Sequence, residues 1–282
     1  MTRVNLDGLQ SFYALSNARQ IPLLGLGVYL IEPGKATEDA VLWALQAGYR
    51  HIDTASMYRN EVSVGNAIRK SGIPRDQIFV TTKLYDHDQG FESAISACEL
   101  SLEKLGLDYI DLYLIHSPNP GPERRNDSWK ALQKLVALGK VKSIGVSNYG
   151  VHHLKELLGS NPTIRPVVNQ IEVHPWLTAR KLSRFVSLSI IAVEAYSPLS
   201  RGHKLEDPML GKIAAKYSKS PAQVLVRWSL QKGYIVLPKS AHKDRIEQNA
   251  DVFDFDLADG DMNVMDSFNE GYVSGWDPTV AP

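Results

Sequence analysis

Short apolar runs alternate with longer amphipathic segments from residue 24 nearly to the end of the chain. The runs are rich in β-branched residues and place apolar side chains on both faces. This pattern is typical of strands that are buried in a parallel sheet. We therefore predict eight strands, at residues 24–29, 50–55, 78–84, 110–115, 143–147, 167–173, 190–195 and 234–238.

The segments between these strands carry helical signals. The clearest cover residues 37–47, with Thr37 as the predicted N-cap, and residues 91–105, 128–138 and 152–158. Each of them is followed by a glycine, which is the residue that most easily takes the left-handed conformation at the end of a helix. We predict loops at residues 119–126, at residues 200–207 and in the tail after Asn269.

Eight strand–helix units match the number that closes a (β/α)8 TIM barrel, a fold of the α/β class. A doubly wound open sheet gives the same local alternation, but its phosphate-binding G-x-G-x-x-G motif is missing after every predicted strand. Near the N-terminus, residues 12–15 and 20–23 flank Asn17 and Ala18. We predict that these two runs form an N-terminal β-hairpin that closes the barrel floor. No Pro/Gly-rich linker divides residues 1–282, so a single domain is expected.

Composition narrows the range of possible partners. The 282 residues include 31 basic and 31 acidic side chains, so the net charge is zero and nothing favours nucleic acid or an anionic membrane. The only cysteine, Cys98, cannot form an intrachain disulfide or a cysteine-rich metal site, and no metal is expected. The N-terminal residues lack a signal-peptide core, and no apolar run approaches the roughly 18 residues that span a bilayer. We expect a cytoplasmic protein.

Ionisable residues mark the ends of three consecutive predicted strands. Asp53, Lys83 and His116 occupy these ends, and Tyr58 follows shortly after the first of them. In a barrel, the C-terminal ends of the strands carry the chemistry. An isolated Asp or Lys at such a position is costly to bury, and these two can pair with each other.

These four residues suggest a general acid. A charged Lys83 favours the phenolate form of Tyr58 and should lower its pKa from about 10. Asp53 would hold Lys83 in place, and His116 could donate a hydrogen bond to a substrate carbonyl oxygen. Taken singly, Asp53 and Lys83 could form a structural ion pair, and His116 could be a structural histidine. Their conjunction on consecutive strands favours a catalytic site.

Five motifs, in order along nearly the whole chain, resemble those of the aldo-keto reductase superfamily, in particular its small microbial and fungal members. They are residues 48–55 (GYRHIDTA), 107–116 (LDYIDLYLIH), 145–148 (GVSN), 169–172 (NQIE) and 237–240 (LPKS). The resemblance implies a monomeric barrel that transfers a hydride from NADPH to an aldehyde or ketone. It also implies that Tyr58 is the proton donor of a catalytic set formed with Asp53, Lys83 and His116.

The same resemblance implies a cofactor site. Ser147, Asn148 and Gln170 would bind the nicotinamide carboxamide, and Tyr196 would stack on the nicotinamide ring. Arg245 would pair with the 2′-phosphate, although this chain has His242 where many members have Thr or Ser. The remaining cofactor positions are Ser197, Leu199, Ser200, Lys239 and Ser240 near the phosphates, and Gln248 and Asn249 near the adenine.

The predicted substrate is a small-molecule carbonyl compound. Tyr29, Tyr85 and Trp276 would form the walls of an open pocket of low selectivity. The sequence leaves two other functions open. A Schiff-base aldolase could use Lys83, but pairing with Asp53 would keep this lysine protonated and non-nucleophilic. A non-catalytic NADPH-binding sensor would have no need of the intact catalytic set.

Overall fold

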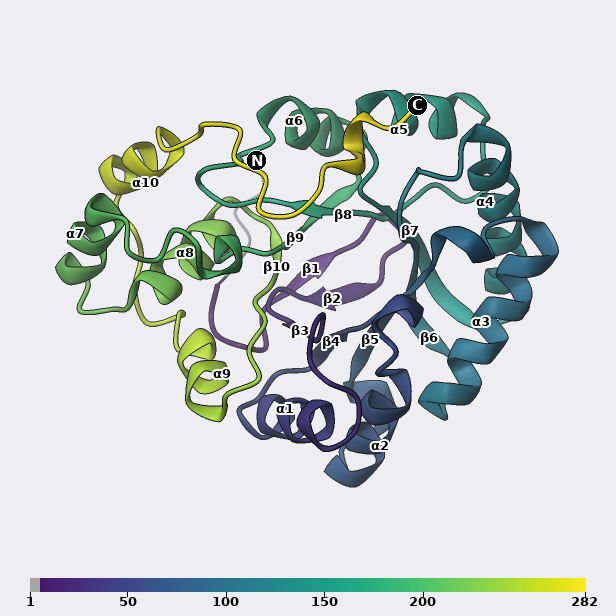
Figure 1. Ribbon diagram of the computed structural model, residues 1–282, viewed down its shortest axis with the longest axis horizontal. Coiled ribbons are helices and arrows are strands. Elements are labelled where there is room, and N and C mark those ends of the chain that lie inside the picture. Colours follow the sequence, from purple (N-terminus) through teal and green to yellow (C-terminus); the bar gives the residue numbers. More distant parts are fainter. Residues whose placement is uncertain (1–5) are drawn as a thin grey trace.

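Eight parallel strands form a barrel with helices around it in the computed structural model, which describes residues 6–282 (Figure 1). Each strand pairs in parallel with the next one along the chain, and a bridge between Leu24 and Val236 joins the two ends of the sheet. The predicted (β/α)8 fold is therefore confirmed. The strands are β3 (Leu26–Gly27), β4 (His51–Asp53), β5 (Phe79–Leu84), β6 (Ile110–Ile115), β7 (Val141–Ser147), β8 (Val168–Glu172), β9 (Ala192–Tyr196) and β10 (Ile235–Leu237).

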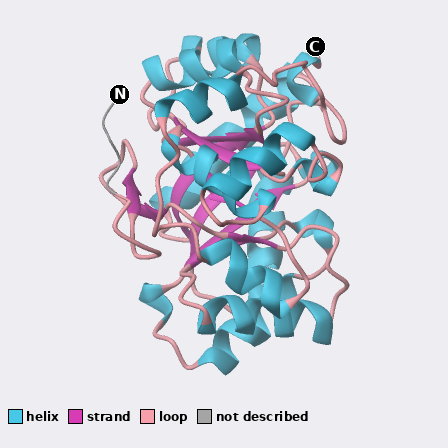
Figure 2. Ribbon diagram, turned by 90° about the vertical axis from the view of Figure 1, so that its left-hand side faces the viewer, coloured by secondary structure: helices cyan, strands magenta, loops and turns pink. Residues whose placement is uncertain are grey.

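The predicted N-terminal hairpin is present. Strands β1 (Phe12–Ala14) and β2 (Gln20–Pro22) pair antiparallel, and Ala18 between them has a φ of 63°. The Asn17 side-chain amide donates to Ser143 Oγ at 3.0 Å, near the amino end of β7. This contact places the hairpin at the floor of the barrel, away from the C-terminal strand ends. Figure 2 shows it at the left, on the side of the N-terminus.

The helices lie outside the strands and cover their apolar outer faces (Figure 1). The sequence explains several of their ends: Ser220 and Gln223 form a capping box at the start of α8, and Gly106, with a φ of 64°, follows the last residue of α3. The helices are α1 (Lys35–Gln46), α2 (Glu61–Ser71), α3 (Phe91–Leu105), α4 (Pro122–Ala137), α5 (Val151–Gly159), α6 (Arg180–Leu188), α7 (Pro208–Lys216), α8 (Pro221–Gln231), α9 (Lys243–Ala250) and α10 (Asp259–Asp266).

Helix α4 begins earlier than predicted, so most of the predicted loop at residues 119–126 is helical. Pro122 occupies the first turn, where its fixed φ suits a helix and its missing N–H costs nothing. Arg125 anchors this turn, because its guanidinium donates to both carboxylate oxygens of Glu156. The prediction differs because the contact of this hydrophilic segment with α5 leaves no trace in the local sequence.

Three further boundaries differ from the prediction. Thr37 lies inside α1 and is not its N-cap: its hydroxyl donates to the Glu32 carbonyl at 2.7 Å. Helix α5 includes Gly159, and the left-handed residue that follows it is Asn161, with a φ of 52°. Strand β9 also starts later than predicted, since Ile190 is 73% exposed and precedes it.

No helix among residues 6–282 is long and apolar enough to cross a membrane.

Close helix packing at Gly65 yields a stability prediction. A Cβ at Gly65 in α2 would lie 1.9 Å from the backbone oxygen of Leu105, at the end of α3. We expect Gly65→Ala to lower the free energy of unfolding by about 1–3 kcal/mol, because two backbones must move apart. Gly211 in α7 is the control, since a Cβ there meets open space among the described residues. Gly211→Ala should raise stability by about 1 kcal/mol through helix propensity. Urea unfolding measures both, and equal effects would contradict this packing.

Candidate active site

The C-terminal strand ends surround a cavity of about 1090 Å³. Asp53 is the last residue of β4, His116 directly follows β6, and Tyr58 lies in a 3₁₀ turn (Ser56–Tyr58) after β4; all three line the cavity. Lys83, from β5, lies behind them with a fully buried side chain. The structure therefore brings the four predicted catalytic residues together.

Lys83 connects Asp53 with Tyr58. Its ammonium group donates to the two Asp53 carboxylate oxygens at 2.7 and 2.8 Å and to the Thr54 carbonyl at 2.9 Å. It also lies 3.3 Å from the Tyr58 hydroxyl. A buried charge is tolerated only when it is paired and hydrogen-bonded, and these contacts satisfy that condition. The positive charge is therefore fixed next to the phenol.

The pKa of Tyr58 moves in the direction opposite to the prediction. Burial, followed by the negative charge of Asp53, raises the pKa of this phenol well above its usual range. The charge of Lys83 was the basis of that prediction, whereas in the folded barrel the phenol also has dry surroundings and the Asp53 carboxylate offsets the lysine charge. The phenol consequently keeps its proton at neutral pH, as a proton donor must. The ammonium of Lys83 is placed to stabilise the phenolate once that proton has left.

His116 is neutral in this setting. Burial lowers its pKa to about 3, and the nearby charge of Lys83 acts in the same direction. Its ring packs edge-on against Tyr58 and Tyr85, with centroids 5.8 and 6.0 Å away. A neutral imidazole carries one N–H and can donate it without adding a second positive charge beside Lys83.

The residues predicted to bind the carboxamide and the nicotinamide ring form a connected wall. Ser147 ends β7, Gln170 lies in β8 and Tyr196 ends β9. The Tyr196 hydroxyl donates to Asn148 Oδ1 at 2.8 Å, and Asn148 Nδ2 donates to Ser147 Oγ at 3.1 Å. Asn148 has a φ of 63°, a left-handed conformation that Asn tolerates better than most residues. All four line the cavity.

The loop after β9 is strained. Ser197, Ser200 and Arg201 have φ values of 49°, 49° and 53°, and such non-glycine residues cluster at functional sites. Ser197 and Leu199 line the cavity. Ser200 lies outside its wall, and its fully buried hydroxyl has no hydrogen-bond partner among the described residues.

The far end of the cavity is basic. Lys239 and Ser240 follow β10, and His242 precedes α9. No ion pair with a carboxylate of residues 6–282 holds Lys239 or Arg245, so both cations are available to an anionic ligand. The cavity thus fits a dinucleotide, with hydroxyl and amide side chains at one end and cations at the other. Its basic end is lined by Lys239, Ser240, Arg245, Gln248 and Asn249.

The predicted substrate-pocket residues line the same cavity. Tyr29 lies next to Tyr58, with ring centroids 4.9 Å apart, and is 38% exposed. Trp276, from the C-terminal tail, is 48% exposed, and Tyr85 follows β5. The predicted catalytic residues therefore lie beside an aromatic part of the cavity wall.

Comparison with known proteins identifies the family of this chain. The sequence model of the Aldo/keto reductase family matches residues 32–270. The chain belongs to the aldo/keto reductase family. It is an NADP-dependent oxidoreductase that reduces carbonyl groups.

Characterised relatives match almost end to end. The 9,11-endoperoxide prostaglandin H2 reductase of Trypanosoma cruzi is 49% identical over 94% of this chain and 93% of its own. The glyoxal reductase of Bacillus subtilis is 46% identical over 96% and 97%. Among crystal structures, an aldo/keto reductase from Brucella melitensis (47% identity) covers 92% of this chain and 99% of its own with a TM-score of 0.88. The Bombyx mori aldo-keto reductase in complex with NADP (39% identity) covers 93% and 94% with a TM-score of 0.87.

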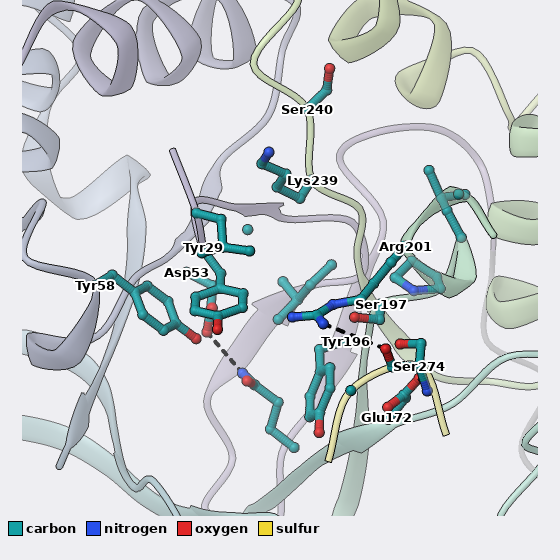
Figure 3. A pocket seen from close by; sticks show the side chains of 18 of the residues that line it. Tyr29, Asp53, Tyr58, Glu172, Tyr196, Ser197, Arg201, Lys239, Ser240 and Ser274 are labelled. Carbon is teal, nitrogen blue, oxygen red and sulfur yellow. Dashed lines mark hydrogen bonds between the residues drawn. The ribbon is translucent and has the colours of Figure 1, made fainter. Parts of the chain in front are cut away.

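The reductase has cavity residues that the sequence argument did not select. Arg201 Nη1 donates to the Ser274 carbonyl at 3.5 Å, and its guanidinium lies 5.7 Å from the Tyr29 ring centroid. Glu172 accepts from the Ser274 amide and from His174, each at 2.9 Å. Figure 3 shows Arg201, Ser274 and Glu172 on one side of the cavity, across from Tyr58. These contacts bring the C-terminal tail to the cavity, and sequence spacing gives no sign of them.

A second carboxyl group lies inside the barrel. Glu194, in β9, is fully buried, and one of its oxygens accepts from Gln170 Nε2 at 2.8 Å. Burial, and next the charge of Asp53, raise the pKa of Glu194 from 4.5 to about 8. Sequence alone did offer a signal, since Glu194 lies near the C-terminal end of the predicted strand at residues 190–195, and an ionisable residue at a strand end is the feature that singled out Asp53.

The raised pKa of Glu194 predicts that the free energy of unfolding depends on pH. Between pH 4.5 and about 8 the unfolded chain loses the Glu194 proton while the folded protein keeps it, so stability falls as pH rises through this range. Glu194→Gln should therefore stabilise the protein more at pH 8 than at pH 5. Thermal unfolding at the two pH values measures this gain, with Glu206→Gln, at an exposed position, as the control. A gain that is independent of pH would contradict a neutral Glu194.

Proposed function

We propose that Tyr58 protonates the carbonyl oxygen of an aldehyde or ketone as this enzyme reduces it to an alcohol. The observation that carries the proposal is the position of Lys83, bound to both Asp53 oxygens and 3.3 Å from the Tyr58 hydroxyl. When bound, NADPH supplies the hydride for the carbonyl carbon. Proton donation from a positioned acid lowers the barrier as negative charge forms on the oxygen.

The surrounding residues have distinct parts in this step. His116 donates its N–H to the carbonyl oxygen and so orients the substrate toward Tyr58. Lys83 stabilises the phenolate that remains, and Asp53 holds the ammonium in place. Because all three are fixed before the reaction, no reorganisation is needed as the charge develops.

The cavity wall supports one orientation of the cofactor. We assign Ser147, Asn148 and Gln170 to the carboxamide and Tyr196 to the face of the nicotinamide ring. The 2′-phosphate is assigned to Arg245. The phosphates are assigned to Ser197, Leu199, Lys239 and Ser240, with Ser200 shaping the loop from behind, and the adenine to Gln248 and Asn249.

The substrate enters between Tyr29, Tyr85 and Trp276, which favours apolar and aromatic carbonyl compounds of varied size. We propose that the enzyme works as a monomer in the cytoplasm, as the family resemblance implies. An aldolase function is disfavoured because the ammonium of Lys83 is surrounded by acceptors and cannot act as a nucleophile. A non-catalytic sensor would bind NADPH without turnover. Turnover of an aldehyde by the wild-type protein that exceeds that of the Tyr58→Phe protein would therefore exclude this function.

Removing the Tyr58 hydroxyl tests the proton donor. We expect Tyr58→Phe to lower kcat for an aldehyde by about 10²–10⁴-fold, the range of general acid catalysis, while NADPH binding measured by fluorescence stays unchanged. Tyr113→Phe is the control, because this hydroxyl is buried outside the cavity and has no hydrogen-bond partner among the described residues. A Tyr58→Phe enzyme with wild-type kcat would overturn the assignment.

Removing the Arg245 charge tests the 2′-phosphate site. Losing one charge-assisted hydrogen bond costs about 1.5–3 kcal/mol, so Arg245→Met should raise KM for NADPH by about 10–100-fold. KM for NADH, which lacks the phosphate, should stay nearly constant. Lys243→Met removes a cation from the same helix outside the cavity wall and should change neither value. An equal rise in KM for NADPH and NADH would show that Arg245 does not bind the 2′-phosphate.

A further inference from the structure

The side-chain amide of Gln170 is held from inside the barrel by two carboxyl groups. Its nitrogen donates to Asp53 Oδ2 and to Glu194 Oε2, both at 2.8 Å. An amide nitrogen has two hydrogens, and these contacts use both of them. Gln170 also lines the cavity, and its side-chain oxygen has no hydrogen-bond partner among the described residues. Both N–H groups of the Gln170 amide are therefore bound inside the barrel, while its side-chain oxygen can still accept a hydrogen bond.

We propose that Glu194 is a positioning residue that turns the Gln170 amide so that it presents an acceptor to the cofactor. The inference rests on the proposed function, which places the nicotinamide carboxamide against Gln170. A carboxamide offers both an oxygen and an NH₂ group. An acceptor on the wall selects the NH₂ group, and so distinguishes nicotinamide from a ring whose substituent has no N–H.

The environment of Glu194 keeps it an acceptor toward Gln170. The charged and titratable groups around it are Asp53 and His51 from β4, Lys83 from β5, and the Tyr58 phenol, which keeps its proton. Lys83 is already bound to Asp53, and burial lowers the pKa of His51 to about 3, so neither supplies Glu194 with a paired positive charge. Glu194 is therefore a neutral acid.

A neutral carboxyl group has one hydroxyl and one carbonyl oxygen. Glu194 Oε1 lies 3.5 Å from His51 Nε2, and no described residue hydrogen-bonds to it. With the proton on Oε1, the oxygen that accepts no hydrogen bond from the described part of the chain, Oε2 remains a carbonyl that accepts from Gln170. The tautomer of the acid and the orientation of the amide thus fix each other.

An apolar side chain at position 194 breaks this arrangement. One N–H of Gln170 would lose its partner in a buried place, which is costly, and the amide could regain one by turning toward the cavity, where water can accept. The wall would then present a donor as well as an acceptor. Discrimination between the two kinds of ring substituent should fall.

Binding without a carbonyl substrate tests this inference. The ligands are NADP⁺ and its 3-acetylpyridine analogue, in which a methyl group replaces the NH₂ group, and tryptophan fluorescence reports Kd. One hydrogen bond corresponds to about a fivefold to tenfold preference of the wild-type protein for NADP⁺. We expect Glu194→Leu to bring the ratio of the two Kd values to within about twofold of one. Glu194→Gln, which retains a carbonyl acceptor, should preserve the preference.

Two further variants separate the possible explanations. Thr81→Val alters the same buried layer, since Thr81 Oγ1 lies 3.0 Å from His51 Nε2, but it leaves both contacts of Gln170 intact and should preserve the preference. Gln170→Met should abolish it. If the Glu194→Leu protein keeps the wild-type ratio of Kd values while the Gln170→Met protein loses it, the positioning role of Glu194 is wrong. The assignment of Gln170 to the carboxamide then still holds. A Gln170→Met protein that keeps the ratio overturns the assignment of Gln170 to the carboxamide, and with it the proposed cofactor orientation.

Discussion

The buried ion pair between Lys83 and Asp53 is the interaction on which the site depends. Either charge alone in the barrel interior would cost several kcal/mol, so the two must meet for the fold to be stable. The sheet register brings them together: Asp53 of β4 pairs with Thr81 of β5, and Lys83 lies two residues further on, on the same face. The geometry that closes the barrel also fixes the charge beside Tyr58.

Asp53 accepts hydrogen bonds from both Lys83 and Gln170, and this extends the site into the barrel. One oxygen contacts Lys83 only, and the other contacts both Lys83 and Gln170. Gln170 in turn binds Glu194. A continuous polar layer therefore runs from the phenol of Tyr58 to the carboxyl group of Glu194 in β9. It holds two acids in different states, because a single lysine can compensate only one of them and the other stays neutral.

Much of this architecture could be predicted from the sequence. Eight apolar runs indicated the barrel, and ionisable residues at consecutive strand ends indicated Asp53, Lys83 and His116, because neither signal needs long-range information. The start of α4 could not be found this way, since it depends on the contact of Arg125 with Glu156. The pKa of Tyr58 was misjudged in direction, because burial and the field of Asp53 are properties of the folded barrel. Glu194 carried the same signal as Asp53 and could have been selected with it.

The role of the Lys83 charge beside Tyr58 is tested most directly by the single-turnover rate of aldehyde reduction by the Asp53→Asn/Lys83→Met double variant, saturated with NADPH. Changing both residues leaves neither charge buried without its partner, so the fold should survive. We expect a rate at least about 100-fold below wild type, because Tyr58 must then form its phenolate without a neighbouring ammonium. Reduction at the wild-type rate would contradict this role of Lys83, since the phenol would then need no charge beside it.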